Sequence, residues 1–162
     1  MTKEISINKV RSDAEELYRD GKFFCSEAIV ASVKKNIAPD MPAELISASS
    51  GFPVGVGRSK CMCGAISGAV ICLGYFFGRT EPSDSKSKHC LNLANELQES
   101  FRKNHDGVLC CHVHTKAWIW QKGNIRNKCI SFTGEMAAKT AEIIARELNI
   151  AIVEPDDSDT GL

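Results

Sequence analysis

Apolar residues recur at helical spacing along most of this chain, and no segment shows the alternation of a β-strand. Four stretches carry an apolar face at intervals of three and four residues, the period of an amphipathic helix. They run over residues 7–20, 26–36, 89–101 and 129–148. The pattern therefore predicts an all-α fold, a compact bundle of about five to seven helices in a single domain.

Polar and turn-forming residues mark the expected ends of these helices. Ser12 and Glu15 have the spacing of a capping box, and Gly21 is a stop signal for the first helix. The stretches EPSDSKSK (81–88) and QKGNIRNK (121–128) predict surface loops. Shorter helices are expected over residues 43–50 and around 113–120. We expect the domain to cover residues 1–153, followed by an acidic flexible tail over 154–162.

The most distinctive stretch runs from Gly51 to Gly78, GFPVGVGRSKCMCGAISGAVICLGYFFG. Its glycine-rich start predicts a loop that bends tightly and approaches another group closely. The apolar run after Cys63 is too long for a typical strand and predicts a buried helix. Small residues such as Gly64 and Gly68 on one face of this helix would let another backbone approach it.

Composition and charge exclude several classes of protein. The 162 residues include 20 Lys and Arg and 20 Asp and Glu, so no basic excess indicates a nucleic acid or an anionic membrane as partner. The N-terminus lacks the apolar segment of a signal peptide, and the longest apolar run, 69–77, is too short to span a bilayer. We therefore expect a cytoplasmic protein, in which the eight cysteines stay reduced.

Four cysteines share one placement along the chain. Cys25, Cys63, Cys110 and Cys129 each stand where a loop leads into a predicted helix. A helix start offers unpaired N–H groups and about half a positive charge. Both favour the thiolate, which is the nucleophilic and metal-binding form. The four cysteines therefore predict helix ends that point at a common anionic centre.

The other four cysteines are interpreted separately. Cys72 lies inside the apolar run and is expected in the core, and Cys90 is expected to be structural. Cys61 lies close to Cys63, and Cys111 follows Cys110. Three interpretations are open for both: additional ligands, resolving thiols, or neighbours without a role.

His112 and His114 are expected to be solvent-facing or hydrogen-bonded, since a metal shared between them would need a non-helical turn. His89 and His105 carry no signal beyond their residue type.

Common cofactor and catalytic patterns are missing from the sequence. It contains no Cys-x-x-Cys of a zinc ribbon or thioredoxin-like site, no ferredoxin run of cysteines and no haem attachment motif. GFPVGVG lacks the Gly-Lys-Ser/Thr ending of a phosphate-binding loop. No paired carboxylates or Ser/His/Asp set indicates a hydrolase.

The segment CGAISG, residues 63–68, fits Cys-Gly-Ala-x-x-Gly. With the order of the cysteines around it, the chain resembles the redox-active C_GCAxxG_C_C family from about Leu17 to Leu148. The resemblance implies four hallmark cysteines, which map to Cys25, Cys63, Cys110 and Cys129. Cys110 is preferred to Cys111 by its spacing from Gly107.

Three functional hypotheses follow from these cysteines. The first is an iron–sulfur protein in electron transfer or cluster handling, since four thiolates match the ligands of a [2Fe–2S] or [4Fe–4S] cluster. Backbone N–H groups at Gly57 and Gly64 would then help to bind the cofactor. The second is a thiol–disulfide redox protein that pairs Cys61 with Cys63 or Cys110 with Cys111. The third is a module that binds zinc or another soft metal.

The expected partner is a redox protein that the sequence does not identify. Neither a nucleic acid nor a membrane is expected as a partner, and a homodimer is left open. An oxidoreductase and an electron-transfer component are both compatible with these hypotheses.

Overall fold

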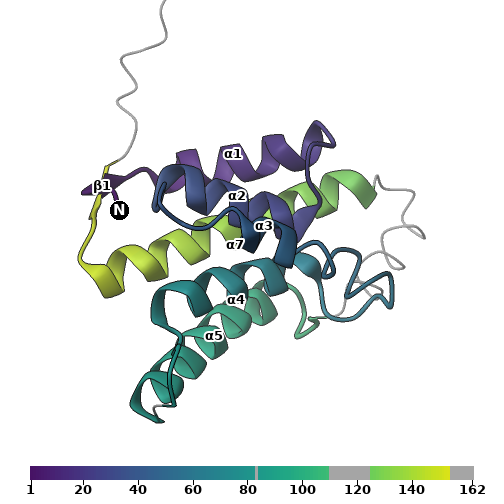
Figure 1. Cartoon of the computed structure of the whole chain (residues 1–162). Coiled ribbons are helices and arrows are strands. Elements are labelled where there is room, and N and C mark those ends of the chain that lie inside the picture. The colour runs from purple at the N-terminus through teal and green to yellow at the C-terminus, as the bar shows by residue number, and fades with distance from the viewer. Residues whose placement is uncertain (83, 110–124, 154–162) are drawn as a thin grey trace, which may run out of the picture.

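The computed structural model describes residues 1–82, 84–109 and 125–153, and helices dominate this part of the chain (Figure 1). The helices are α1 (Ile7–Arg19), α2 (Cys25–Asn36), α3 (Glu44–Ala48), α4 (Gly64–Phe77), α5 (Asp84–Asn104) and α7 (Ile125–Leu148). The only sheet among the described residues has two strands, β1 (Glu4–Ile5) and β2 (Ala151–Ile152). The predicted all-α class is confirmed. The short helix expected around 113–120 and the expected tail lie outside the described residues.

Helices α1 and α7 lie side by side and antiparallel (Figure 1). At one end the parallel strands pair Glu4 with Ala151 and Ile5 with Ile152, which joins the start of α1 to the end of α7. At the other end the Arg126 guanidinium donates a hydrogen bond of 2.8 Å to the Arg19 carbonyl. Helix α2 packs on α1, α4 and α7, and α5 packs on the outer side of α4. The start of α7 therefore lies next to the end of α1.

Several predicted helix boundaries were wrong. Helix α1 is capped by Ser6, whose hydroxyl accepts a hydrogen bond of 3.1 Å from the Lys9 N–H, whereas Ser12 lies inside the helix. Helix α5 begins at Asp84, within the expected loop 81–88, because exposed Ser and Lys residues continue a helix without an apolar face. Helix α7 begins at Ile125 and not at Cys129. Tertiary contacts extend it, since Arg126 bonds to the end of α1.

The core draws apolar side chains from every helix except the short α3. Its largest fully buried members include Ile29, Ile66, Leu97, Phe101 and Ile144. Cys72 is also fully buried there, and burial raises the pKa of its thiol to about 12. The prediction that Cys72 is a core residue is confirmed. Among the described residues, no helix combines the length and hydrophobicity needed to span a bilayer.

The small face of α4 lets the backbone of α2 approach closely, as predicted. A Cβ atom added to Gly68 would lie 2.6 Å from both the Cα and the carbonyl oxygen of Ser26, closer than Cβ atoms are found to other atoms. Ser26 is fully buried and its hydroxyl donates a hydrogen bond of 2.9 Å to the Ser49 carbonyl. Only glycine fits at position 68 while the two helices keep this distance.

One carboxylate is buried between α1 and α2. The Asp13 side chain is 4% exposed and accepts hydrogen bonds from Lys9 and Asn36, and the Lys35 ammonium lies 3.0 Å away. Burial by itself would raise the pKa of Asp13, but the bonds from Lys9, Asn36 and Lys35 outweigh it and hold the pKa below its usual value. This carboxylate is therefore charged in the folded protein and links the two helices.

Replacement of Gly68 by alanine should destabilise the protein by about 1–3 kcal/mol, the usual cost of overpacking. Gly74→Ala in the same helix is the matched control, because nothing lies within 4 Å of a Cβ atom at Gly74. It should stabilise the helix by up to ~1 kcal/mol. Urea unfolding of both variants measures the difference. Equal effects of the two substitutions would contradict the close approach of α2 and α4.

Replacement of Asp13 by alanine should lower the free energy of unfolding by about 1–3 kcal/mol at neutral pH, because Lys9, Asn36 and Lys35 lose their bonds to the buried carboxylate. The folded pKa of Asp13 is lowered, so the unfolded chain takes up this proton more readily. Its contribution is therefore full above the unfolded pKa of about 3.9 and is lost as the pH falls through the folded pKa. Unfolding free energies from pH 7 to pH 3 should show the gap between parent and variant narrowing. A gap independent of pH would overturn this account.

Candidate functional site

Three cysteines from three different helices line one cavity. The cavity lies where α1 ends and where α2, α4 and α7 begin, and it has a volume of about 150 Å³. Its lining residues are Tyr18, Phe24, Cys25, Val54, Cys63, Ala65, Ile125, Cys129 and Phe132. Residues far apart in the sequence thus meet at one end of the bundle.

The predicted site residues divide into three groups. Cys25 is the first residue of α2 and Cys63 is the N-cap of α4, as expected from their place at helix starts. Cys129 also lines the cavity, but it lies in the second turn of α7 and not at a helix start, because that helix begins at Ile125. Cys110 and Cys111 lie outside the described residues.

The other described cysteines, Cys61, Cys72 and Cys90, are not among the lining residues. Cys61 is exposed. Cys72 is in the core, and Cys90 is partly buried on α5.

Gly64 makes room for the sulfur of Cys25. A Cβ atom added to Gly64 would lie 2.5 Å from the Cys25 Sγ. The Glu27 carboxylate fixes the start of α2, since it accepts a hydrogen bond of 2.9 Å from the Phe24 N–H. Gly64 is therefore needed to place the Cys25 sulfur beside the residue that follows Cys63.

The loop before α4 folds back on itself. Residues with positive φ follow one another in it, namely Val54, Gly55, Val56, Gly57 and Arg58. A Cβ atom at Gly55 would lie 2.3 Å from the backbone nitrogen of Cys61, so the predicted close approach is to the loop's own backbone. Val54, with a φ of 56° that is rare for a β-branched residue, lines the cavity. Nothing lies within 4 Å of a Cβ atom at Gly57, and its cofactor-binding role stays a prediction.

Tyr18 is a site residue that the sequence patterns did not single out. Burial raises the pKa of its hydroxyl, and the electrostatic influence of Cys129 and Cys25 and a hydrogen bond to Cys129 raise this pKa further, against the smaller effect of Arg126. The hydroxyl therefore stays protonated at neutral pH and can donate a hydrogen bond to sulfur. The spacing of apolar residues around Tyr18 carries no signal of this role.

Phe101, His105 and Phe132 form a ring cluster that packs against the cavity through Phe132. Phe132 lines the cavity and packs edge-on against His105, with ring centroids 4.6 Å apart. The His105 Nε2 lies 2.7 Å from a carboxylate oxygen of Glu135, and Phe101 covers the same ring at 4.2 Å. No role is predicted for His105 from its sequence context. Its place in the ring cluster depends on how α5 meets α7.

The side chains that line the cavity could ligate a soft metal ion or cluster, although the described ones are not arranged as a complete metal site. Its described lining residues include thiols and a phenol and no carboxylate or imidazole, and thiolates select zinc, copper(I) and iron–sulfur clusters. Within the described ranges, no group of three or more His, Cys, Asp or Glu side chains is arranged to hold a metal ion. The three cysteines of the lining therefore share a cavity without forming a complete ligand set by themselves.

Comparison with known proteins identifies a family. Residues 23–143 match the model of the family described as "Putative redox-active protein (C_GCAxxG_C_C)". No curated protein and no solved structure matches the chain. The family match runs from just before Cys25 to beyond Cys129 and includes the Cys-Gly-Ala-x-x-Gly segment at Cys63. Because it spans well over half of the sequence, the chain belongs to the C_GCAxxG_C_C family of redox-active proteins.

Proposed function

We propose that this protein binds an iron–sulfur cluster in the cysteine cavity and transfers electrons through it. Cys25, Cys63 and Cys129 would be three of the ligands, and Cys110 the fourth. The observation that carries the proposal is that three hallmark cysteines, separated by long stretches of sequence, line a single cavity. When bound, the cluster would accept and release one electron at a time, and no bond to the protein would form or break.

The size of the cavity favours a small inorganic group. Pockets for organic ligands usually measure about 300–1,000 Å³. The cavity of about 150 Å³ falls below that range. Its volume and its thiols together support a metal–sulfur group over a nucleotide or an organic substrate.

One contact of the described chain supports Cys110 as the fourth ligand. The Cys63 N–H donates a hydrogen bond of 3.2 Å to the carbonyl of Leu109, the residue before Cys110. The described chain is therefore held beside Cys63 at the point from which Cys110 follows. Cys61, which is exposed and outside the lining, has less support as an additional ligand.

The protein groups around the cavity would favour a negatively charged cluster. Cys25 and Cys63 stand at the N-terminal ends of α2 and α4, where unpaired N–H groups carry partial positive charge. The Tyr18 hydroxyl adds a hydrogen-bond donor next to Cys129. Hydrogen bonds to cluster sulfurs and burial are the main means by which proteins set a cluster's reduction potential.

The second candidate is a thiol–disulfide redox protein, with a pairing different from those that the sequence suggested. The Cys25 Sγ lies beside the backbone of Gly64, which favours a pair with Cys63. Oxidation of this pair would form one S–S bond and release two electrons and two protons to a disulfide acceptor, which is itself reduced to two thiols. This candidate requires no metal.

Replacement of Cys63 by serine should remove most of the iron and sulfide from protein purified without oxygen. Serine presents a harder oxygen that is far less acidic than a thiol, and iron–sulfur clusters disfavour it. Cys25→Ser and Cys129→Ser should behave similarly. Chemical analysis of iron, sulfide and zinc together with the visible spectrum checks this result.

Cys90→Ser and Cys72→Ser are the controls, because Cys90 and Cys72 lie outside the cavity lining. Both should keep the iron content of the parent. A parent protein without iron but with a titratable Cys25–Cys63 dithiol would establish the second candidate. A parent that contains zinc and no iron would identify a soft-metal module.

Replacement of Gly64 by alanine should lower the iron content without unfolding the protein. The new Cβ atom would lie 2.5 Å from the Cys25 Sγ and 3.1 Å from both the Phe52 carbonyl oxygen and the Pro53 Cα, so the sulfur must rotate away and the loop must shift slightly. Iron per protein and the circular dichroism spectrum measure the two effects, with Gly74→Ala as the matched control. Full iron occupancy in the Gly64 variant would contradict the assigned role of this glycine.

A further inference from the structure

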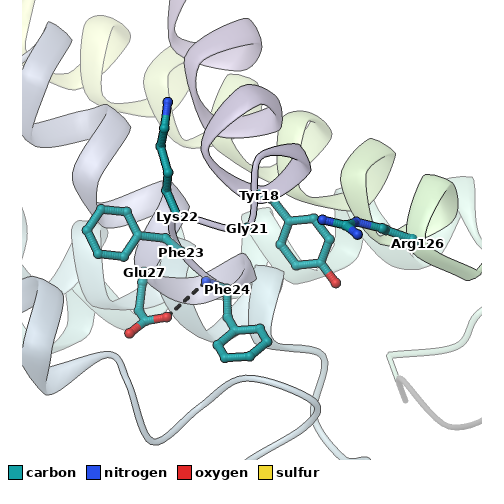
Figure 2. A pocket seen from close by; sticks show the side chains of 7 residues that line it. All are labelled: Tyr18, Gly21, Lys22, Phe23, Phe24, Glu27 and Arg126. Carbon is teal, nitrogen blue, oxygen red and sulfur yellow. Dashed lines mark hydrogen bonds between the residues drawn. The ribbon is translucent and has the colours of Figure 1, made fainter.

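A second, larger hollow adjoins the cysteine cavity on the surface. It has a volume of about 570 Å³ and is open to solvent. Figure 2 shows its lining residues, which are Tyr18, Gly21, Lys22, Phe23, Phe24, Glu27 and Arg126. Two of them, Tyr18 and Phe24, also line the cysteine cavity. The two spaces therefore share part of their lining.

We propose that this surface pocket binds a planar, negatively charged aromatic molecule that exchanges electrons with the cysteine site. The proposal rests on the redox function proposed above and names the class of small molecule that would serve it. In the exchange, the cysteine site would lose one electron and the bound ring would gain it, or the reverse, and no covalent bond would form. The pocket volume lies within the range of small-molecule sites.

Aromatic rings make up much of the pocket wall. Tyr18, Phe23 and Phe24 contribute three rings from the end of α1 and the turn that follows it (Figure 2). Phe24 is 56% exposed, so its ring is accessible to a ligand from solvent. Stacking against such rings favours a flat aromatic ligand, because offset-stacked and edge-on ring pairs gain energy beyond the area that they bury.

At the Tyr18 end of the pocket the lining has a cation, Arg126, while the Glu27 carboxylate lies on the other side of Phe24 (Figure 2). The Glu27 carboxylate accepts hydrogen bonds from the Phe24 N–H at 2.9 Å and from the Ser50 hydroxyl at 2.6 Å. Arg126 donates a hydrogen bond of 2.8 Å to the Arg19 carbonyl. Figure 2 shows Arg126 beside the ring of Tyr18. A guanidinium at the edge of an aromatic wall suits a ring that carries a sulfonate, carboxylate or phosphate.

Lys22 adds less to this preference. Its ammonium is paired with Asp20 at 2.9 Å, and its side chain extends away from Tyr18 in Figure 2. We therefore assign the anion contact to Arg126 and the ring contact to Phe23, since both line the surface pocket and neither lines the cysteine cavity.

Isothermal titration calorimetry with anthraquinone-2-sulfonate tests the site, because this probe is planar, anionic and redox-active. The parent protein should bind it, and Arg126→Gln should weaken binding about tenfold, which corresponds to ~1.4 kcal/mol. Phe23→Leu should also weaken binding, whereas Arg126→Lys should retain part of it. The neutral 2-(hydroxymethyl)anthraquinone should bind more weakly than the sulfonate. Lys128→Gln is the matched control, because Lys128 is a cation on the same helix that lies over Phe132 and outside the pocket.

The same titration on the Cys63→Ser variant separates this proposal from the proposed function. Binding that persists without iron would support the pocket independently of the cluster. No binding to the parent at millimolar probe would overturn the proposal and leave the iron result untouched. Equal affinity of the Arg126→Gln and Phe23→Leu variants and the parent would place the ligand elsewhere and also overturn it. Equal affinity for the neutral probe would overturn the assignment of an anion.

Discussion

The close contact between α2 and α4 is the constraint on which the rest of the structure depends. Gly68 lies against the backbone of Ser26, and one turn earlier Gly64 lies against the sulfur of Cys25. A side chain at either position would push the helices apart or displace the sulfur. The two glycines of the Cys-Gly-Ala-x-x-Gly segment thus serve the same helix crossing. This crossing places Cys25 beside the start of α4, where Cys63 is the N-cap.

The antiparallel pair α1 and α7 completes the site from the other side. Because α7 begins where α1 ends, Cys129 in the second turn of α7 comes close to Tyr18 near the end of α1. The paired strands at the far end of the two helices help to hold this alignment. The site is therefore assembled from the ends of helices, where the backbone offers polar groups and solvent is near. The buried middle of the bundle supplies the rigidity.

Tyr18 lines both the cysteine cavity and the surface pocket. In the cavity it is joined by the three cysteines, and in the pocket by Phe23 and Arg126. A protonated phenol at this position can donate to sulfur while its ring forms part of the outer wall.

The sequence by itself determined the helical class, the core position of Cys72 and the importance of the Cys-Gly-Ala-x-x-Gly segment. These features are local, since the period of apolar residues fixes which face of a helix is buried, and the family motif is contiguous. The sequence did not reveal the Ser6 cap, the early starts of α5 and α7, or the place of Cys129 inside a helix. It also gave no sign of Tyr18 or Phe132 as cavity residues, or of the atoms that require Gly64. Only the tertiary structure decided these points, because they depend on which helices cross and at what distance. The spacing of apolar residues along one helix predicts its buried face, but it does not identify the helix that packs there.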